Sequence, residues 1–261
     1  MKSSLASMKI LNVSITDETE KSILKYFLQR LKIGKEKFFI VTPNPEIIVH
    51  ANKHLDYKDK LNKAEISLPD GTGVFLASFF LGKPLYERIP GVDFIDFLCR
   101  ETKDNPLSMG FLGGRQGVAK RAVECLRERY PWIDVVFVGE EWPEEYYQSE
   151  KRKAKSEKLD TKAQHSSAAI DILFVAFGFP KQEEWIYNNL DRLPVRCAMG
   201  VGGAFDYISG HVTRAPFWVR AAGFEWLYRL QKEPWRWRRQ LALLEFIWLA
   251  MKERLHLSLS L

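Results

Sequence analysis

The stretch that decides the fold is residues 170–201, IDILFVAFGFPKQEEWIYNNLDRLPVRCAMGV. It begins with an apolar run at 170–177, continues with a helix-like segment at 181–193, and ends with a second apolar run at 195–201. Apolar runs of this length, joined by a helical segment, are typical of buried strands in a parallel sheet. The stretch therefore predicts a strand, a helix and a strand of an α/β domain.

The same alternation extends on both sides of this stretch. Further strands are predicted at residues 8–15, 38–41, 65–68, 107–112 and 133–138, the last of them buried. Helices are predicted at residues 18–31, from 46 onward, and at 73–81, 91–101 and 116–129. We therefore predict a Rossmann-like α/β fold with a mostly parallel sheet and flanking helices. In such sheets, ligands bind beyond the carboxyl ends of the strands.

The composition limits the class of protein. The chain has 261 residues, 46% of them hydrophobic, and a net charge of +6, which indicates a sizeable core and anionic partners. Its three cysteines show no Cys-x-x-Cys spacing, so a zinc site or disulfide framework is not expected. The N-terminus lacks an apolar signal-peptide core, and the longest apolar run, residues 74–81, is too short to span a bilayer. We expect a cytoplasmic protein, soluble or peripheral to a membrane.

Two segments depart from the α/β pattern. Residues 149–167 are polar and are expected to form a solvated loop or frayed helix. After about His211 the chain carries nine Lys or Arg, four Glu and five of the eight tryptophans. Pro234 suits a first helical turn, and an apolar helical stripe follows it: Trp237, Leu241, Leu244, Trp248, Met251 and Leu255. We predict an α/β domain over residues 1–210 and a basic helical appendage over 211–261.

Polar residues gather where the predicted strands end. Thr42 and Asn44 follow one strand, and Asp70 follows another. Taken alone, each has a structural explanation, because Thr and Asn cap helices and an Asp between Pro and Gly is typical of a turn. In a strand-end crevice the same groups can contact a ligand, and a carboxylate there can act as a general base.

Further clusters have the same double interpretation. Arg88, just before a predicted helix, is either a surface residue or an anion ligand. Gly113 and Gly114 either allow tight strand-to-helix packing or bring backbone amides close to a phosphate, although they do not match G-x-G-x-x-G. Gln182 lies at another strand-to-helix junction. Asp206, after a glycine run, either caps the next segment or binds ribose or base edges.

In this order, the clusters resemble a single family. The resemblance covers residues 8–255 and is most specific in seven blocks: TPNPEIIVHA (42–51), LPDGTGV (68–74), ERIPGVDF (87–94), FLGGRQGVA (111–119), VAFGFPKQE (175–183), GVGGAFDYISG (200–210) and RAPFWVRAAGFEWLYRLQKEPWRWRRQ (214–240). These blocks are similar to the WecG/TagA/CpsF glycosyltransferases, which assemble teichoic-acid linkage units and other surface polysaccharides. The resemblance implies a UDP-sugar donor of the UDP-N-acetylmannosamine type and an undecaprenyl-diphosphate-linked N-acetylglucosamine acceptor.

The resemblance also implies roles for matching residues. Asp70 corresponds to the family's proposed general base, with Thr42 and Asn44 beside it. Arg88 and Gln182 correspond to polar residues of the active-site cleft, and Asp206 corresponds to a nucleotide-contacting residue. Three arginines of the tail correspond to residues that close over the diphosphate: Arg229, Arg236 and Arg239. Residues 139–147 depart from the family's Gly-aromatic loop, so no uracil-stacking residue is assigned.

The implied reaction is an inverting displacement at the anomeric carbon. It needs a base for the acceptor hydroxyl and positive charge for the departing diphosphate. Many nucleotide-sugar enzymes hold a divalent ion with an Asp-x-Asp pair, and the sequence contains no such pair. We predict that no metal and no other cofactor is needed, because arginines and helix N-termini can supply the positive potential.

Two other functions stay open from the sequence. An NAD(P)-binding oxidoreductase shares the fold class, and a non-enzymatic module for a membrane or nucleic acid would explain the Trp- and Arg-rich tail. For a transferase with a lipid-linked acceptor, we expect residues 211–261 to associate with the anionic inner face of the bacterial membrane, and we expect no nucleic-acid partner. N-acetylmannosamine, its uronic acid and other sugars are compatible with the sequence, as are a monomer and a homo-oligomer.

Overall fold

The fold is built on a six-stranded parallel sheet. The computed structural model describes residues 4–34, 36–144 and 170–259. The strands are β3 (Phe38–Val41), β4 (Ile66–Ser67), β5 (Ser108–Gly113), β6 (Asp134–Gly139), β7 (Ile170–Ala176) and β8 (Val195–Gly200). They lie in the order β4-β3-β8-β7-β5-β6, and every pairing is parallel. The predicted α/β fold with a mostly parallel sheet is confirmed.

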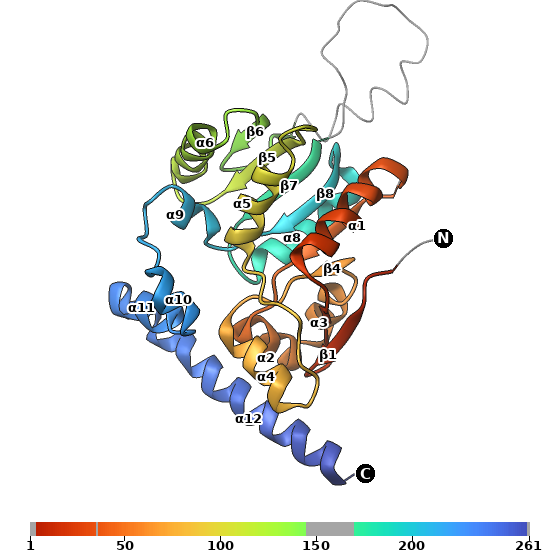
Figure 1. The fold of residues 1–261 in the computed structure, drawn as a ribbon, viewed down its shortest axis with the longest axis vertical. Helices are drawn as coiled ribbons and strands as arrows, with labels where there is room; N and C mark the ends of the chain where they lie inside the picture. Colours follow the sequence, from red (N-terminus) through yellow and green to blue (C-terminus); the bar gives the residue numbers. More distant parts are fainter. Residues whose placement is uncertain (1–3, 35, 145–169, 260–261) are drawn as a thin grey trace, which may run out of the picture.

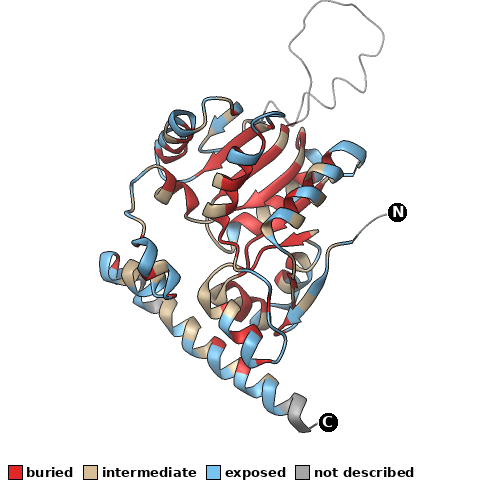
Figure 2. Ribbon diagram, viewed as in Figure 1, coloured by how far each residue is buried: buried red, intermediate tan, exposed pale blue. Residues whose placement is uncertain are grey.

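Helices cover both faces of the sheet (Figure 1). One core contains side chains of α1 (Glu20–Ile33), α5 (Gly91–Glu101), α6 (Val118–Arg129) and α9 (Ala204–Ile208). The other contains side chains of α2 (Pro45–Lys53), α3 (Leu55–Leu61), α4 (Thr72–Phe80) and α8 (Lys181–Asn189), which a 3-10 turn (Leu190–Arg192) extends. The strands in the centre are buried, whereas the outer helix faces are exposed (Figure 2).

The apolar strand β3 supplies both cores. Phe38 and Ile40 point into one core, and Phe39 and Val41 point into the other. A strand covered on both faces is stable with a continuous apolar sequence, because neither row of side chains meets water. This arrangement explains why residues 38–41 show no polar alternation.

The prediction of one strand at residues 8–15 is wrong. This segment forms a hairpin of β1 (Ser7–Ile10) and β2 (Val13–Thr16), which is separate from the main sheet. Leu11 and Asn12 turn the chain with φ angles of 50° and 61°. Positive φ at both turn residues matches the right-handed twist of a two-residue hairpin, and Asn adopts it readily.

The prediction that residues 133–138 form a buried strand is also wrong in part. The strand exists as β6, but it lies at the edge of the sheet, and Val136 is 52% exposed. An apolar run does not by itself distinguish a central strand from an edge strand. The helix α3 has no counterpart among the predicted elements. The predicted polar loop at 149–167 lies outside the described residues.

The chain after Gly210 forms a helical arm along one side of the domain (Figure 1). It contains α10 (Phe217–Ala221), α11 (Glu225–Lys232), a 3-10 turn that begins with Pro234, and α12 (Trp237–Leu259). The helical character of this segment agrees with the prediction, and the domain boundary at residue 210 stays a prediction.

The helix α12 contacts α2 and α4 through a face that the sequence pattern did not single out. That face carries Phe246 and Ala250, which are 1% and 4% exposed. The predicted stripe is exposed to solvent, and its six side chains range from 44% exposed for Met251 to 65% for Leu244. The helix therefore has one apolar face against the core and a second one that faces outward.

We expect Phe246→Ala to lower the free energy of unfolding by about 3–5 kcal/mol, because it leaves a cavity where a fully buried ring was. The matched control is Leu244→Ala on the exposed stripe, which should cost no more than about 0.5 kcal/mol. Denaturant unfolding followed by tryptophan fluorescence measures both. Equal costs would show that the stripe packs against the domain.

Candidate active site

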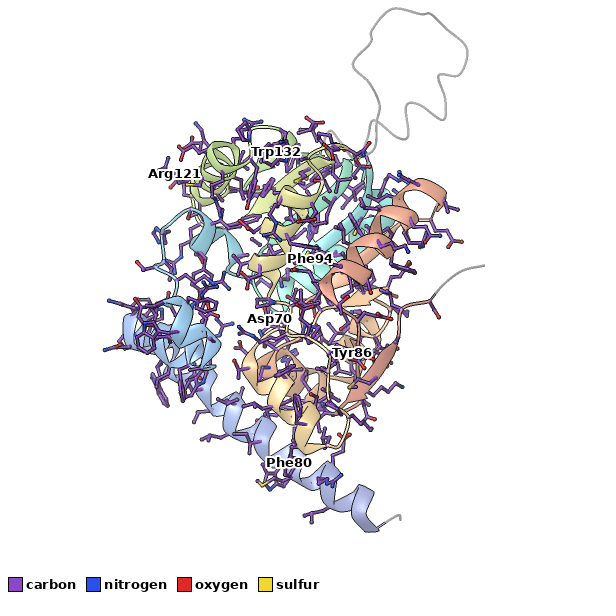
Figure 3. The ribbon with its side chains drawn as sticks, in the orientation of Figure 1. Asp70, Phe80, Tyr86, Phe94, Arg121 and Trp132 are labelled. Atoms are coloured by element: carbon purple, nitrogen blue, oxygen red, sulfur yellow. The ribbon has the colours of Figure 1, made fainter. Side chains whose placement is uncertain are left out.

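A cleft of about 1100 Å³ opens at the carboxyl edge of the sheet. Its walls come from the segments that follow β3, β4, β5, β7 and β8, and from α11 and α12 of the C-terminal arm. Asp70, labelled in Figure 3, lies close to this edge. Nine of the predicted site residues line the cleft: Thr42, Asn44, Asp70, Arg88, Gly114, Gln182, Asp206, Arg229 and Arg239.

Thr42 and Asn44 shape the end of β3. The buried Thr42 hydroxyl donates to the carbonyl of Gly200 at 3.1 Å and so joins the ends of β3 and β8. The Asn44 side chain accepts from the amide of Ile47 at 3.0 Å and caps α2. The helix-capping interpretation of Asn44 is therefore confirmed, and the cap brings the residue to the cleft wall.

Asp70 occupies a turn at the N-terminus of α4. Gly71 has a φ of 87°, which permits the sharp change of direction before the helix begins. The amide of Asp70 donates to the carbonyl of Pro43 at 3.0 Å. The backbone amide of Gly91 favours the charged form of the Asp70 carboxylate and so lowers its pKa. Burial, followed by the charge of Glu225, raises the pKa of Asp70 to about 7, while Arg88 acts in the opposite direction. Asp70 is thus a carboxylate with unusual proton affinity.

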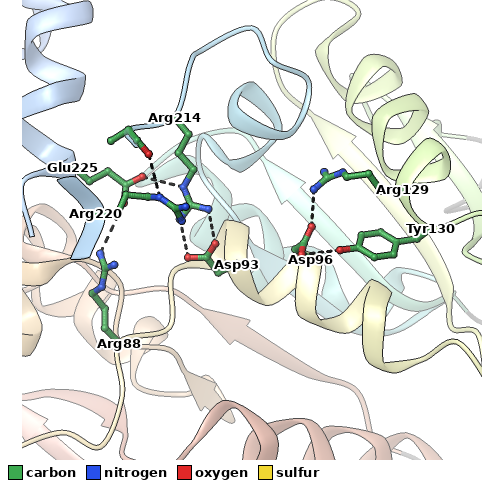
Figure 4. Close-up of polar contacts among 9 residues, drawn as sticks. Arg88, Asp93, Asp96, Arg129, Tyr130, Arg214, Arg220 and Glu225 are labelled. Atoms are coloured by element: carbon green, nitrogen blue, oxygen red, sulfur yellow. Dashed lines mark hydrogen bonds and ion pairs between the residues drawn. The ribbon is translucent and has the colours of Figure 1, made fainter. Parts of the chain in front are cut away.

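Arg88 and three residues that sequence reasoning missed form a charged network beside Asp70 (Figure 4). Arg214 donates to both carboxylate oxygens of Asp93 and to Glu225. Glu225 also lies 3.8 Å from Arg88. All three missed residues stand in blocks that carried the family resemblance, Asp93 in ERIPGVDF and Arg214 and Glu225 in the tail block, but nothing in the sequence shows that these blocks meet.

Gln182 lies in the first turn of α8 and is buried. Its side-chain oxygen accepts from the amide of Gly202 at 2.8 Å, and its nitrogen donates to Glu183 at 2.7 Å. Burial raises the pKa of Glu183 to about 7. The two contacts fix the orientation of the Gln182 amide and so define the floor of the cleft between β7 and β8.

Asp206 and Arg229 face each other near Gly203. A side chain at Gly203 would meet Nη2 of Arg229 at 3.0 Å and Oδ2 of Asp206 at 3.3 Å. The Arg229 guanidinium lies 4.7 Å from the centre of the Tyr207 ring and donates to Glu233 at 2.8 Å. Asp206, which the resemblance predicts to contact the nucleotide, therefore lies after the end of β8, where α9 meets the C-terminal arm.

The other predicted tail arginines and the glycine pair have separate surroundings. Arg239 donates to Glu46 of α2 at 2.8 Å. The side chain of Arg236 lies outside the described part of the structure. Gly114 lines the cleft, whereas Gly113 ends β5 with a φ of 92°, and a Cβ there would lie 2.7 Å from the Phe177 ring. Gly113 therefore allows tight strand-to-helix packing. At Gly114 a ligand can come close to the backbone, because this residue lines the cleft.

Positive charge exceeds negative charge in the cleft. Among the described lining residues there are five arginines and four carboxylates: Arg88, Arg115, Arg214, Arg229 and Arg239, and Glu46, Asp70, Asp206 and Glu225. Arg115, which sequence reasoning did not assign, stands exposed in the Gly-rich turn before α6. Within the described residues, no three His, Cys, Asp or Glu side chains are grouped so that they could hold a metal ion. The arrangement suits a ligand that carries phosphates.

Comparison with known proteins agrees with this geometry. The model of the Glycosyl transferase WecG/TagA/CpsF family matches residues 8–259. The chain belongs to this family. It is a glycosyltransferase, and the predicted resemblance is confirmed over the whole α/β domain and the C-terminal arm. The family assignment decides against an NAD(P)-binding oxidoreductase and against a non-enzymatic module.

Curated relatives share about a third of their residues with the chain. One from Bacillus subtilis (strain 168) is 32% identical over 242 residues, which cover 93% of this chain and 90% of the relative. One from Bacillus spizizenii is 33% identical over 214 residues, 82% of this chain and 79% of the relative. One from Staphylococcus aureus (strain NCTC 8325 / PS 47) is 33% identical over 236 residues, 87% of this chain and 85% of the relative. Each is named an N-acetylglucosaminyldiphosphoundecaprenol N-acetyl-beta-D-mannosaminyltransferase.

Proposed function

We propose that the protein transfers N-acetylmannosamine from a UDP donor to N-acetylglucosamine on an undecaprenyl-diphosphate carrier, with inversion at the anomeric carbon. Such a reaction belongs to the synthesis of teichoic-acid linkage units or related surface polysaccharides. The observation that carries the proposal is a carboxylate with a pKa of about 7 in an arginine-rich cleft, in a chain of this family. The names of the relatives supply the sugar and the acceptor.

Asp70 acts as the general base in this proposal. It takes the proton of the attacking acceptor hydroxyl while the hydroxyl oxygen bonds to the anomeric carbon and UDP leaves on the opposite face. A base with a pKa close to the working pH combines a useful unprotonated fraction with strong proton affinity. The pKa of about 7 for Asp70 meets that requirement, whereas an exposed aspartate would be a far weaker base.

Arginines stabilise the departing diphosphate in this proposal. Arg229 lies beside Asp206 at the nucleotide end of the cleft, and Arg239 and Arg88 lie along its walls. Each is held by a carboxylate partner before substrate arrives: Glu233, Glu46 and Glu225, respectively. Fixed positive groups stabilise developing negative charge with little reorganisation, so the reaction needs no divalent ion.

The C-terminal arm is proposed to lie on the membrane. No helix among the described residues combines the length and hydrophobicity that a bilayer crossing requires. Large apolar side chains are nevertheless exposed on neighbouring helices: Leu76, Phe79 and Phe80 on α4, Phe217 and Trp218 on α10, Trp226 and Leu227 on α11, and the six stripe residues on α12. Such a surface, with tryptophans and basic residues, is typical of proteins that bind an anionic membrane.

The exposed apolar surface continues into the cleft. Phe80 of α4 and Met251 of α12 are both partly exposed and both line the cleft. Leu243, Phe246 and Ile247 of α12 add further apolar lining to the same cleft. A lipid-linked acceptor can therefore leave the bilayer with its chain on apolar surface while its sugar reaches the polar end.

We expect Asp70→Asn to keep the fold and lose on the order of a hundredfold or more of turnover, because the base is removed. The wild-type kcat/KM should fall as the pH drops below about 7, since protonated Asp70 cannot accept a proton. Initial rates of transfer across pH 5–9 measure both effects. The control is Asp134→Asn, at an exposed position outside the cleft. Near-wild-type turnover in folded Asp70→Asn would remove the assigned role.

Transfer should continue in excess EDTA, because the arginines rather than a divalent ion stabilise the diphosphate. The measurement is the initial rate with and without EDTA, beside a metal-dependent nucleotide-sugar transferase as a positive control for chelation. Complete loss of activity in EDTA, followed by recovery with manganese or magnesium, would contradict the proposal.

We expect Leu244→Glu to weaken binding to phosphatidylglycerol-containing vesicles on the order of tenfold, because burial of a Leu side chain contributes roughly 1.5–3 kcal/mol. Val136→Glu on the edge strand β6 makes the same kind of change at an exposed position far from the arm, and it should bind vesicles normally. Vesicle co-sedimentation measures both variants. Equal binding by both would show that the stripe does not contact the membrane.

A further inference from the structure

Arg214 fastens the beginning of the C-terminal arm to the α/β domain (Figure 4). Its guanidinium forks onto both carboxylate oxygens of Asp93 on α5, at 2.7 Å for the Nη2 bond, across a separation of 121 residues. Its Nε donates to Glu225 on α11 at 3.0 Å. All three side chains are partly buried. A planar guanidinium suits this position, because its donors can hold two carboxylates at once in fixed geometry.

Glu225 links the Arg214 ion pairs to a residue of the cleft. Its second carboxylate oxygen lies 3.8 Å from Nη1 of Arg88. The amide of Ile89 donates to the carbonyl of Pro69 at 3.0 Å, so Arg88 and Asp70 stand in adjacent segments that line the same cleft. The charge of Arg88 therefore acts both on Glu225 of the arm and on Asp70 of the domain. The pull of Glu225 on Arg88 competes with the pull of Asp70. Glu225 therefore acts on Arg88 and Asp70 only when α11 lies against the domain.

We propose that Glu225 is a positioning residue of the transfer reaction: Arg214 fixes its carboxylate over the cleft, and the carboxylate holds Arg88 so that Asp70 stays available as a proton acceptor. This inference rests on the proposed role of Asp70. If α11 moves away, Arg88 is free to pair with Asp70, and a carboxylate paired with an arginine is a weaker base. Closure of the arm therefore activates the base as well as covering the cleft.

The groups that face Asp70 come from three elements. They are Glu225 from α11, Arg88 from the segment before α5, and Asp93 with the Gly91 amide from α5. Burial is the largest cause of the raised pKa of Asp70, and the charge of Glu225 is the next. Loss of that charge lowers the pKa directly, and the release of Arg88 lowers it again. A substitution that leaves α11 and the charge of Glu225 in place should not change this ionisation.

The test is the pH dependence of kcat/KM for Glu225→Gln. Its acidic limb should move to lower pH, so that at pH 6 the variant keeps a larger share of its maximal kcat/KM than the wild-type enzyme does. Its maximal value should fall, because Arg88 is no longer held. The matched control is Glu245→Gln, which breaks the ion pair between α12 and Lys53 outside the cleft. This control should leave the acidic limb in place.

Two further variants separate the possible failures. If the wild-type enzyme transfers no sugar, the proposed function is overturned. If Asp70→Asn turns over normally, the role of Asp70 is overturned and this inference with it. If Asp70→Asn is inactive and Glu225→Gln keeps the wild-type limb, only this inference is overturned. Arg214→Lys retains the charge but cannot hold Asp93 and Glu225 together, and its limb should move in the same direction as that of Glu225→Gln. It also serves if Glu225→Gln does not fold, and a wild-type limb in Arg214→Lys would then overturn the inference.

Discussion

Parallel pairing of β3 with β8 is the constraint on which the rest of the structure depends. Phe38, Phe39 and Ile40 pair with residues of β8, and the Thr42 hydroxyl closes the same pair against Gly200 across 158 residues of sequence. Because parallel strands all end at the same edge, each crossover returns the chain to the opposite edge before the next strand begins. Loops from distant parts of the sequence therefore converge at one place, and the cleft lies there.

Most arginines of this cleft are already paired with carboxylates. Arg214 is shared by Asp93 and Glu225, and Arg239 is held by Glu46. These pairs keep long flexible side chains in defined positions, which reduces the entropy that a phosphate ligand must remove on binding. They also reduce the net positive charge of the cleft, which would help the diphosphate of the proposed donor to leave after the reaction. The same pairs attach the C-terminal arm to the domain, so the binding of substrate and the position of the arm depend on the same contacts.

The elements that a local sequence pattern determines could be predicted, whereas the features that depend on residues distant in the sequence could not. The strand at 38–41 and the helix at 91–101 were predictable, because apolar runs and helical periodicity decide them locally. The hairpin at 8–15 and the edge position of β6 were not, because an apolar run does not reveal a tight turn or the lack of a second neighbour. Asp70 was a candidate base from its place at a strand end, and the family resemblance then assigned roles to Asp70 and Gln182. Glu225 and Arg214 were missed because their importance arises only when α11 meets α5 and Arg88.

The two apolar faces of α12 suggest how the arm would respond to the membrane in the proposed reaction. Phe246 fixes one face to the domain, whereas the stripe on the other face leaves large apolar side chains in water, which is unfavourable unless another surface covers them. A bilayer that covered the stripe would stabilise the arrangement in which the arm lies against the domain. That arrangement is the one in which Glu225 holds Arg88 and Arg229 faces Asp206. Proton acceptance, diphosphate binding and membrane contact would then be favoured together, so the enzyme would react with its donor chiefly where the lipid-linked acceptor is present, and hydrolysis of donor away from the membrane would be limited.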